Sequence, residues 1–445
     1  MLTYIDKFLN KYTMYKVVLY ALLILAAYSL IVDFTWNKVV SLVILMVGSY
    51  MLNQVIGRIL KAPVGSESST ITGLILYLIL APYATIATQC LVVAIAMLSK
   101  YVFAWKKRHI FNPAAFVVAL APFMGIVDFT WWIASAVYLP LVVILGLLVV
   151  RKTRRMTMFL VFVVVAGGIA LIKGVGVAEL FISFPIIYFG AFMLTEPAST
   201  PPTTKLRIIY AVIVGVLFNF YFELAIVVGN IFSFIVSPKD YKILKFLEKN
   251  QLANGVVEYV FAGRVAFTAG QYAEWTVPHD ADSRGNRRYF TIASSPTEEH
   301  IRIGIREGVS SFKKALETTD KIVVSQVAGE FVLPKDKTIK LAFLAGGIGV
   351  TPFRSMIQYL IDIKEERDIV LFYSASAPDM FAYKDVFAKY PVKAEYVPMI
   401  TKEMLEPHRD REFYISGPNV MVDIFKKMLK EMGVKKIITD YFPGY

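Results

Sequence analysis

Apolar and polar residues are distributed differently in the two halves of the chain. Between residues 16 and 236, apolar runs of helical length follow one another and are separated by short polar turns. From Pro238 onward, charged residues return every few positions, and apolar residues alternate with polar ones as they do in half-buried strands. This pattern predicts a helical domain over residues 1–237, followed by a globular domain of strands and helices.

The apolar runs of the first half are long enough to cross a bilayer, for which about 20 helical residues suffice, and fewer where a segment is broken. The sequence therefore predicts a polytopic α-helical membrane domain of about ten spans. The approximate boundaries of these spans are 15–33, 38–59, 69–82, 84–104, 112–126, 131–150, 155–173, 177–195, 206–219 and 222–237.

Basic residues give this domain a predicted orientation. The formal net charge is +13 and the chain is 57% hydrophobic, which is typical of a membrane protein with a basic cytoplasmic side and argues against a nucleic-acid partner. We therefore expect a multi-pass protein of the cell inner (cytoplasmic) membrane, in contact with the lipid bilayer and with both termini in the cytoplasm. The basic positions are Lys7, Lys11, Lys16, Arg58, Lys61, 106–108, 151–155, Lys205 and Arg207.

Thiols and imidazoles are scarce. The single cysteine, Cys90, excludes an internal disulfide and a cysteine-ligated iron–sulfur cluster. Of the four histidines, only His109 lies in the apolar half, so one chain cannot supply the paired axial ligands of two haems. We expect no metal site, and we interpret His109 as a polar residue at the membrane interface.

Two proline-containing segments of the apolar half are expected at the same membrane face. They are "RHIFNPAAF", from Arg108 to Phe116, and "TEPASTPPTTK", from Thr195 to Lys205. A broken segment frees backbone amides and helix ends, which can meet a polar or anionic group inside a bundle. Ordinary helix punctuation explains the same residues equally well.

The second half contains a strand that combines a cation, an aromatic ring and a hydroxyl, "RRYFTIASSP" (Arg287 to Pro296). An extended strand places Arg288 and Phe290 on one face and Tyr289 and Thr291 on the other. One face can therefore meet a phosphate and an aromatic ring together.

Two glycine turns follow. In "REGVSSFKKAL", Gly308 precedes a predicted helix with Ser310 or Ser311 at its start, where unpaired amides favour a diphosphate, although serines also cap helices for structural reasons. In "IKLAFLAGGIGVTPFRSMIQYL", an apolar strand ends in Gly346, Gly347 and Gly349, whose backbone can approach a dinucleotide closely. The spacing differs from G-x-G-x-x-G, and a tight turn is the alternative interpretation.

In this order the segments resemble the ferredoxin-NADP reductase family, over residues from about Tyr241 to Tyr445. The resemblance implies an antiparallel β-barrel domain that binds FAD, at 238–334, and an α/β domain that binds NAD(P), at 335–445. The matching residues are Arg288, Phe290, Thr291 and Ser294 in the flavin motif, Gly308 and Ser311 in the phosphate motif, and Gly346, Gly347, Gly349, Thr351 and Pro352 in the nicotinamide motif.

The same resemblance implies residue roles. Arg288 would contact the FAD pyrophosphate, Phe290 would pack on the flavin, and Thr291 would hydrogen-bond near its reactive nitrogen. We expect Thr291, Ser416, which replaces a cysteine frequent in the family, and Tyr445 to take part in catalysis, with Tyr445 or Phe442 covering the flavin ring. Tyr289, Ser310, Gly417, Pro418 and Tyr445 complete the candidate cofactor-binding residues.

The coenzyme is expected to be NADH rather than NADPH. A 2′-phosphate needs a cationic partner. The segment from Tyr373 to Phe387 has Ser374 and Ser376 where a guanidinium would help, and only Lys384 downstream.

The apolar half resembles a membrane flavoprotein family that includes the B subunit of the sodium-pumping NADH:quinone reductase and the D subunit of the Rnf complex. The similar segments are "RHIFNPAAF" and "MLTEPASTPPTTKLRIIYAVIVGVL". This resemblance implies a second flavin, FMN or riboflavin, held between helices, and the family's covalent attachment motif is replaced here, so that a non-covalent flavin is expected. The candidate positions are Arg108, His109, Asn112, Thr130, Glu196, Ser199 and Thr200.

The sequence thus predicts a membrane-bound NAD(P)H-dependent flavin oxidoreductase. Electrons would pass from NAD(P)H through FAD to the membrane flavin, and then to a quinone or an extracytoplasmic acceptor. Two alternatives stay open: a haem-type transmembrane reductase with a ligand other than histidine, and a transporter or channel whose second half senses redox state.

Overall fold

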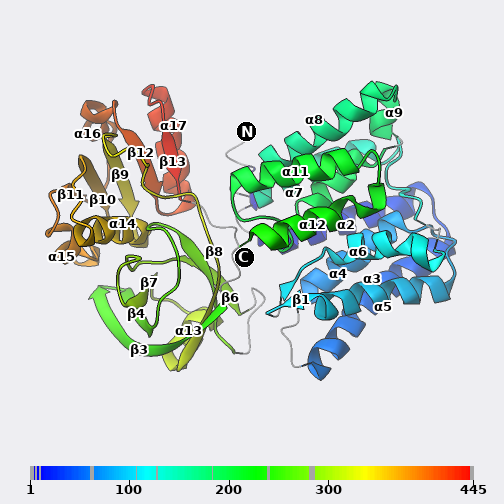
Figure 1. The fold of residues 1–445 in the computed structure, drawn as a ribbon, viewed down its shortest axis with the longest axis horizontal. Helices are drawn as coiled ribbons and strands as arrows, with labels where there is room; N and C mark the ends of the chain where they lie inside the picture. Colours follow the sequence, from blue (N-terminus) through cyan, green and yellow to red (C-terminus); the bar gives the residue numbers. More distant parts are fainter. Residues whose placement is uncertain are drawn as a thin grey trace. The chain divides into compact units, whose positions relative to one another are not determined.

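The computed structural model describes residues 5, 8–9, 12–60, 65–106, 108–126, 129–182, 184–237, 241–279 and 286–440. The chain divides into two compact units, unit 1 (Met1–Ser237) and unit 2 (Pro238–Pro443). Unit 1 is helical, and unit 2 contains two β-sheets (Figure 1). We describe each unit by itself.

The helices of unit 1 begin at side chains that can accept a hydrogen bond from the first turn. Thr13, Thr35, Thr85, Asn112 and Thr203 cap α2, α3, α5, α6 and α11 in this way. The elements are α2 (Met14–Val32), α3 (Trp36–Ile59), α4 (Ser66–Ile79), α5 (Ile86–Val102), β1 (Ala104–Trp105), β2 (Arg108–His109), α6 (Pro113–Leu120), η1 (Ala121–Met124), α7 (Leu139–Thr153), α8 (Met156–Ile172), α9 (Val177–Ile182), α10 (Ile186–Tyr188), η2 (Phe189–Leu194), α11 (Thr204–Leu217), η3 (Phe222–Leu224) and α12 (Ala225–Val236).

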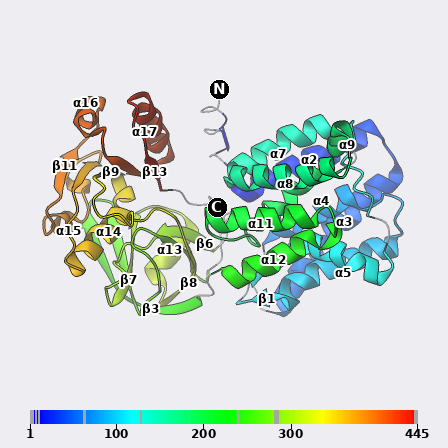
Figure 2. The ribbon, with the colours of Figure 1, turned by 45° about the horizontal axis from the view of Figure 1, so that its top comes forward.

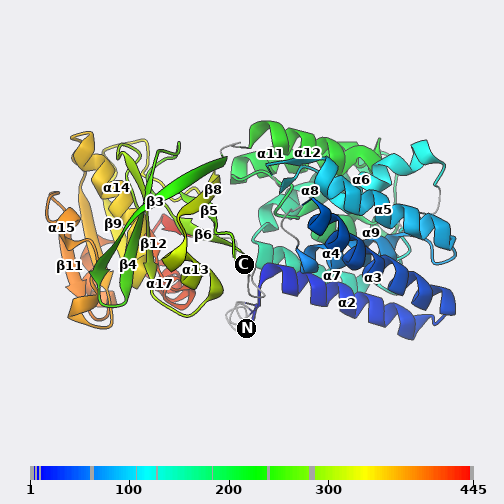
Figure 3. The ribbon, with the colours of Figure 1, turned by 90° about the horizontal axis from the view of Figure 1, so that it is seen from below.

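Glycines allow several of these helices to approach closely. A Cβ added to Gly73 of α4 would lie 2.2 Å from the Leu45 carbonyl oxygen of α3, and one added to Gly215 of α11 would lie 3.0 Å from the side chain of Val165 in α8. The neighbours α8, α11 and α12 lie side by side in Figure 2, and α2, α3 and α4 do so in Figure 3. Close backbone contact at small residues is typical of helix packing in membranes.

The predicted count of about ten spans is not supported. Within the described residues, only α2, with 19 residues, and α3, with 24, are long and apolar enough to cross a membrane. The expected span 112–126 is an α-helix of 8 residues continued by a short 3-10 helix, which begins at Ala121 and has Pro122 in its first turn. The span expected at 131–150 becomes helical only at Leu139: Trp131 adopts a φ of 50°, and residues 132–138 form turns and bends. The span expected at 177–195 is divided around Pro185 into α9, α10 and the π-helix η2.

The first part of unit 2 is an antiparallel sheet whose strands pair in the order β6-β5-β8-β3-β4-β7. Its core contains the ring systems of Trp275, Phe261 and Phe312. Phe312 belongs to α13, the one helix among the described residues of this part. The elements are β3 (Tyr241–Ala253), β4 (Val256–Ala262), β5 (Tyr272–Thr276), β6 (Arg287–Thr291), β7 (His300–Arg306), α13 (Ser311–Thr318) and β8 (Lys321–Ala328).

The second part is a parallel sheet in the order β11-β10-β9-β12-β13. Successive residues of β9 enter two different cores: Phe343 packs with Phe353 of α14, whereas Leu344 belongs to the core that contains Phe425 of α17. Helices therefore cover both faces of the sheet, as in other parallel α/β folds. The elements are β9 (Leu341–Gly346), η4 (Gly347–Val350), α14 (Thr351–Asp362), β10 (Ile369–Ser374), η5 (Pro378–Met380), α15 (Lys384–Phe387), β11 (Lys393–Val397), α16 (Lys402–Leu405), η6 (Glu406–His408), β12 (Glu412–Ser416), α17 (Asn419–Glu431) and β13 (Ile437–Thr439).

Candidate active site

The two faces of β6 carry the groups that strand alternation predicts. The Arg288 guanidinium lies 5.5 Å from the centre of the Phe312 ring, and the Phe290 ring lies 5.7 Å from the same ring. On the opposite face, the Tyr289 hydroxyl is 3.3 Å from a carboxylate oxygen of Glu274. Arg288 and Phe290 therefore share the face that adjoins α13, whereas Tyr289 belongs to a polar cluster of the sheet.

The start of α13 is a basic site. Ser310 caps the helix by accepting a hydrogen bond from the Lys313 amide at 3.4 Å, and the Ser311 hydroxyl is 3.1 Å from Nε2 of His279. Burial lowers the pKa of Lys313, and the charge of Arg306 lowers it further. A Cβ on Gly308 would lie 3.2 Å from the Lys313 ammonium. A helix N-terminus with these cations fits a diphosphate, which would relieve their mutual repulsion.

The glycine loops of β9 and β12 meet at the edge of the parallel sheet. In chain order the strands read 3-2-1-4-5, so the direction of the strand order reverses between β9 and β12, the position at which open α/β sheets bind ligands. A Cβ on Gly346 would lie 2.2 Å from the Met421 sulfur, and one on Gly349 would lie 2.5 Å from the Ser416 carbonyl oxygen. Gly347 adopts a φ of 53°. The two loops therefore pack directly against each other, and we call their junction the glycine cradle. An added Cβ at Gly347 would meet no atom within 4 Å, so the backbone at this position is open to the close approach of a dinucleotide.

The remaining nicotinamide-motif residues support this cradle. The buried Thr351 hydroxyl donates to the Ile348 carbonyl at 3.1 Å, and Pro352 lies in the first turn of α14. The Ser416 hydroxyl is engaged by the Asp440 carboxylate at 3.0 Å, and Gly417 and Pro418 join β12 to α17. Phe442 and Tyr445 lie outside the described residues, so their expected roles stay predictions.

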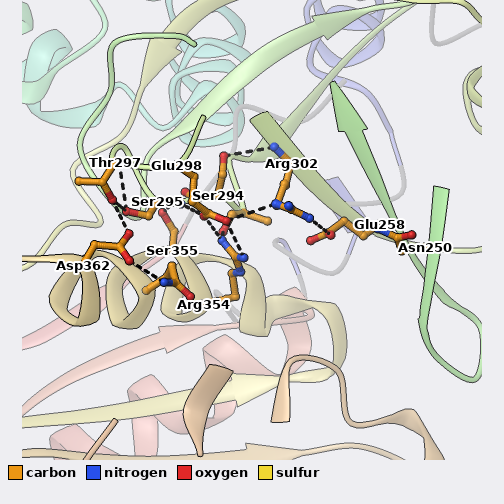
Figure 4. A network of polar contacts seen from close by, with 12 residues as sticks. Asn250, Glu258, Ser294, Ser295, Thr297, Glu298, Arg302, Arg354, Ser355 and Asp362 are labelled. Atoms are coloured by element: carbon orange, nitrogen blue, oxygen red, sulfur yellow. Dashed lines mark hydrogen bonds and ion pairs between the residues drawn. The ribbon is translucent and has the colours of Figure 1, made fainter. Parts of the chain in front are cut away.

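A polar network connects the two parts of unit 2, and no sequence motif predicts it (Figure 4). Glu298, Arg354 and Ser355 belong to it. Burial by itself lowers the pKa of Arg354, but the hydrogen bonds and the charge of Glu298 outweigh this effect and raise it. No local signal marks the pair, because the two residues are 56 positions apart and each is an ordinary polar residue in its own segment.

In unit 1, the two proline-containing segments do come together. His109 Nε2 lies 3.4 Å from a carboxylate oxygen of Glu196, whose other oxygen accepts a hydrogen bond from Ser199 at 2.8 Å. The Thr200 hydroxyl donates to the Glu196 carbonyl at 2.9 Å. Asn112 and Glu196 also line a partly open cavity with a volume of about 40 Å³, together with residues of α2, α4 and α7. For Arg108, only the backbone, in β2, is described.

Two polar residues beside this cluster were missed. Asn230 of α12 accepts the Asn112 amide at 2.8 Å and donates to the Ser199 carbonyl at 3.1 Å, so it joins the two segments. Lys100 of α5 donates to Ser68, which lines the cavity, at 3.2 Å. Asn230 is the only amide side chain of α12 and Lys100 the only charged side chain of α5, and each of these features can be recognised in the sequence.

Thr130 does not belong to this cluster, contrary to the prediction. Its amide donates to the carbonyl of Ile79, the last residue of α4, whereas the cavity is lined by residues of α4 from Ser68 to Ile75. Asn112 and Thr130 also lie at opposite ends of α6 and its 3-10 continuation. Thr130 is exposed at the opposite end of these elements.

Comparisons with known proteins concern the second half of this architecture. A family model described as the oxidoreductase NAD-binding domain matches residues 343–399. A flavohemoprotein of Bacillus thuringiensis is 23% identical over 238 residues, which cover 44% of this chain and 59% of that protein. The C-terminal part of the chain is a ferredoxin-reductase-like FAD/NAD-binding module. We call it the reductase module.

Other relatives are similar to the same extent. The NADH oxidoreductase HCR of Escherichia coli is 27% identical over 194 residues, covering 40% of this chain and 59% of that protein. The chain thus spans about three fifths of the length of these relatives. Among solved structures, the FAD/NAD-binding domain of nitric oxide dioxygenase from Vibrio cholerae has a TM-score of 0.40 and 18% identity, covering 45% of this chain and 98% of that domain. Phthalate dioxygenase reductase has a TM-score of 0.38 and 21% identity, covering 45% of this chain and 67% of that protein.

The comparisons confirm the resemblance of the second half to the ferredoxin-reductase family, including FAD and NAD(P)H as the ligands of such a module. They do not show the resemblance of the first half to the membrane flavoprotein family. The membrane flavin and the onward path of the electrons are therefore proposals.

Proposed function

We propose that this protein oxidises NAD(P)H, with NADH preferred, and passes the electrons through FAD in the reductase module to a carrier in unit 1 and then to a quinone or an extracytoplasmic acceptor. The observation that carries the proposal is the pairing, within one unit, of the basic α13 site beside Arg288 and Phe290 with the glycine cradle of β9 and β12. When bound, FAD supplies a centre that accepts two electrons as hydride and releases them singly.

The chain's own residues would bind and orient the two ligands. Arg288, Lys313 and the amides at the start of α13 would hold the FAD diphosphate, because cations and a helix N-terminus both stabilise its charge. Phe290 and Thr291 would contact the flavin ring. The backbone from Gly346 to Gly349 would bind the nicotinamide nucleotide, with Ser416 at the edge of the same cradle.

The preference for NADH rests on the segment after β10. Residues 374–397 contain no arginine. The Lys384 ammonium in this segment lies over two aromatic rings, 5.0 Å from the centre of Phe381 and 5.2 Å from that of Tyr396. A lysine held against two ring faces is a poor partner for a 2′-phosphate, and a ratio of kcat/KM for NADH over NADPH below one would contradict the preference.

Unit 1 is proposed to lie in the membrane because large apolar side chains lie on its outside as well as in its core. Its helices expose large apolar side chains, such as Ile31, which is 80% exposed, and Ile172, which is 87% exposed. Extensive exposure of large apolar side chains favours contact with lipid or with another protein. Polar side chains are buried among the apolar residues of the interior: Ser29, Ser41, Ser49, Asn53, Ser69, Thr72, Gln89, Ser99, Asn112, Asn230 and Ser233.

The proposed carrier of unit 1 is a non-covalent FMN or riboflavin in the cavity lined by Asn112 and Glu196. The hydroxyl, amide and carboxylate groups around this cavity can hydrogen-bond the polar edge of a flavin, while Val149 and Phe192 supply apolar contacts. His109, Ser199 and Thr200 would support Glu196 from outside the cavity.

The test is a flavin inventory of the full chain purified from membranes in detergent. Acid precipitation followed by chromatography should release one FAD and one further flavin per chain, and NADH should bleach both in sequence. A Soret band would contradict the proposal and indicate a haem reductase. FAD as the only flavin, together with solute flux, would indicate a redox-sensing transporter. Recovery of the chain in the soluble fraction would overturn the membrane assignment.

A further inference from the structure

The start of α14 is hydrogen-bonded to the segment that follows β6, which we call the flavin strand because it carries Arg288, Phe290 and Thr291. Ser355, which is fully buried, donates its hydroxyl hydrogen to the Ser294 carbonyl at 2.7 Å and accepts the Gly270 amide at 3.3 Å (Figure 4). Ser294 lies three residues after Thr291, and Ser355 lies four residues after Thr351. A short covalent path therefore connects each proposed ligand site to this contact.

Arg354 makes a second attachment beside the first. Its guanidinium donates to the Ala293 carbonyl at 3.0 Å and binds both carboxylate oxygens of Glu298, one of them at 3.0 Å. The side chain is 7% exposed. A bidentate arginine pair of this kind fixes orientation as well as distance, because two parallel hydrogen bonds must be satisfied together.

Glu298 is itself held in place. It accepts the Ser295 amide at 2.5 Å, and the Arg302 guanidinium lies 3.2 Å from its other oxygen. The Glu298 carboxylate therefore holds Ser295 and Arg302 in place. Arg354 attaches α14, the helix that follows the nicotinamide loop, to the same carboxylate. The guanidinium is buried and the carboxylate is 20% exposed, so removal of Glu298 would leave a buried charge without its partner.

We propose that Arg354 is a positioning residue for hydride transfer. Through its contacts with Glu298 and Ala293, it fixes the distance and orientation of the nicotinamide cradle relative to the flavin strand. This inference rests on the proposed function of the reductase module. In the step concerned, a hydride leaves the reduced nicotinamide, which is oxidised, and joins the flavin, which is reduced. Arg354 contacts neither ring and acts only through the backbone that it holds. Misplacement of reacting groups by about 1 Å can lower a rate ~100-fold.

The test uses the full chain in detergent, with Arg354→Lys and Ser355→Ala as the main variants and Arg409→Lys as the matched control. Arg409 pairs with Glu406 on the exposed surface, so its replacement by lysine should change nothing. Arg354→Lys keeps the charge and loses the bidentate geometry. The rate of flavin reduction is measured by stopped flow at saturating NADH. In Arg354→Lys this rate should fall roughly 10- to 100-fold, while the FAD content stays within about twofold of wild type.

Two further readouts separate positioning from catalysis and from folding. Amide hydrogen exchange of the FAD-loaded chain without NADH should accelerate at residues 293–298 and 346–352 together in Arg354→Lys and in Ser355→Ala. The long-wavelength charge-transfer absorbance of stacked nicotinamide and flavin should weaken, while the dissociation constant for NAD⁺ changes less than about threefold.

The outcomes are distinguishable from failure of the proposed function. If NADH does not reduce the flavin of the wild-type chain, the proposed function is wrong. If the wild type is reduced and Arg354→Lys matches it in rate and in exchange at both segments, the positioning role is wrong and the proposed function stands. Slower reduction explained entirely by lost FAD also contradicts the positioning role.

Discussion

Gly349 and Ser416 touch through their backbones: a Cβ added to Gly349 would lie 2.5 Å from the Ser416 carbonyl oxygen and 2.6 Å from the Gly417 nitrogen. This contact closes the junction between the β9 and β12 loops at the point where the strand order of the parallel sheet reverses. Backbone atoms at these positions cannot move aside as a flexible side chain can. The shape of the proposed nucleotide cradle therefore depends on the absence of a side chain at position 349.

Replacement Gly349→Ala should separate nucleotide binding from FAD binding. The added methyl group must displace one of the two loops, and we expect the KM for NADH to rise about tenfold or more, equivalent to ~1.4 kcal/mol. FAD content should stay unchanged, because the basic site at α13 is a separate set of residues. The control is Gly168→Ala in α8, where an added Cβ meets no atom within 4 Å. Unchanged NADH affinity in Gly349→Ala would place the nucleotide elsewhere.

The carboxylate of Glu258 is predicted to stabilise unit 2. It is 3% exposed, accepts a hydrogen bond from Arg302 at 2.7 Å and accepts one from the Tyr383 hydroxyl at 3.0 Å. Glu258→Ala leaves a partly buried guanidinium with fewer partners and should cost about 3 kcal/mol, since breaking such pairs typically costs 3–5 kcal/mol. Heating the full chain while recording the fluorescence of released FAD measures the loss.

Tyr383→Phe is the comparison for this prediction. It removes one hydrogen bond to the same carboxylate and leaves the ion pair in place, so about 1 kcal/mol is expected. Burial raises the pKa of Tyr383 well above its ordinary value, so the phenol stays neutral at working pH and the comparison is not altered by its ionisation. Equal losses in the two variants would show that the ion pair adds nothing.

Local patterns explain what the sequence could predict in unit 2. The alternation of Arg288 to Thr291 and the glycines at 346–349 are consequences of strand geometry and of close backbone contact, and both can be recognised within ten residues. The Arg354–Glu298 pair cannot be recognised in this way. Glu298 lies in the loop before β7 and Arg354 lies in α14, so the two residues come together only when the two parts of unit 2 pack.

The length of the helices in unit 1 was predicted poorly because average apolarity says nothing about backbone conformation. Residues 131–150 are uniformly apolar enough to be read as one span, yet Trp131 has a positive φ and the helix starts at Leu139. By contrast, the expectation that the two proline-containing segments share a site followed from their common predicted face, and the His109–Glu196 contact joins them. The candidate Thr130 came from the resemblance alone, and it lies at the opposite end of α6 and η1.

The affinity for FAD should fall at alkaline pH because of Lys313. Burial and the charge of Arg306 lower the pKa of this lysine below its ordinary value of 10.5 in the folded chain. A bound diphosphate favours the charged ammonium, so binding raises this pKa and takes up protons. FAD affinity is therefore predicted to be fully present below the lowered pKa of the ligand-free site and to fall as the pH rises from that value towards 10.5.

The folding stability of the ligand-free chain should change with pH in the opposite direction to its affinity for FAD. A lysine with a lowered folded-state pKa costs stability while it is charged, so stability rises with pH across the window between the lowered pKa and 10.5.

Fluorescence titrations with FAD across this range test the binding prediction. Lys313→Met should weaken binding roughly tenfold at neutral pH and flatten the alkaline decline, because it removes a charge-assisted hydrogen bond. Lys313→Arg should keep the affinity and move the decline to higher pH. An unaltered pH profile in Lys313→Met would exclude this lysine from the diphosphate site.

Packing of α3 against α4 is predicted to control electron transfer beyond FAD without affecting the reduction of FAD itself. A Cβ on Gly73 would lie 2.2 Å from the Leu45 carbonyl oxygen and 2.9 Å from the Met46 Cα, so Gly73→Ala must push two backbones apart. Overpacking of this kind typically costs about 1–3 kcal/mol. Residues of α4 from Ser68 to Ile75 line the cavity proposed for the second flavin, so the displacement should empty or reshape it.

The matched control is a glycine of α3 that faces α5 and not α4. Gly48→Ala in α3 places its Cβ 3.7 Å from the side chain of Val93, an ordinary contact, and should behave as the wild type. In Gly73→Ala we expect NADH to reduce FAD at the wild-type rate, since FAD belongs to a separate compact unit, while the second flavin is lost and quinone reduction falls in proportion. Rapid-scanning absorbance of both flavins after mixing with NADH resolves these steps. A variant that keeps both flavins and full quinone reduction would show that this cavity does not carry the electrons.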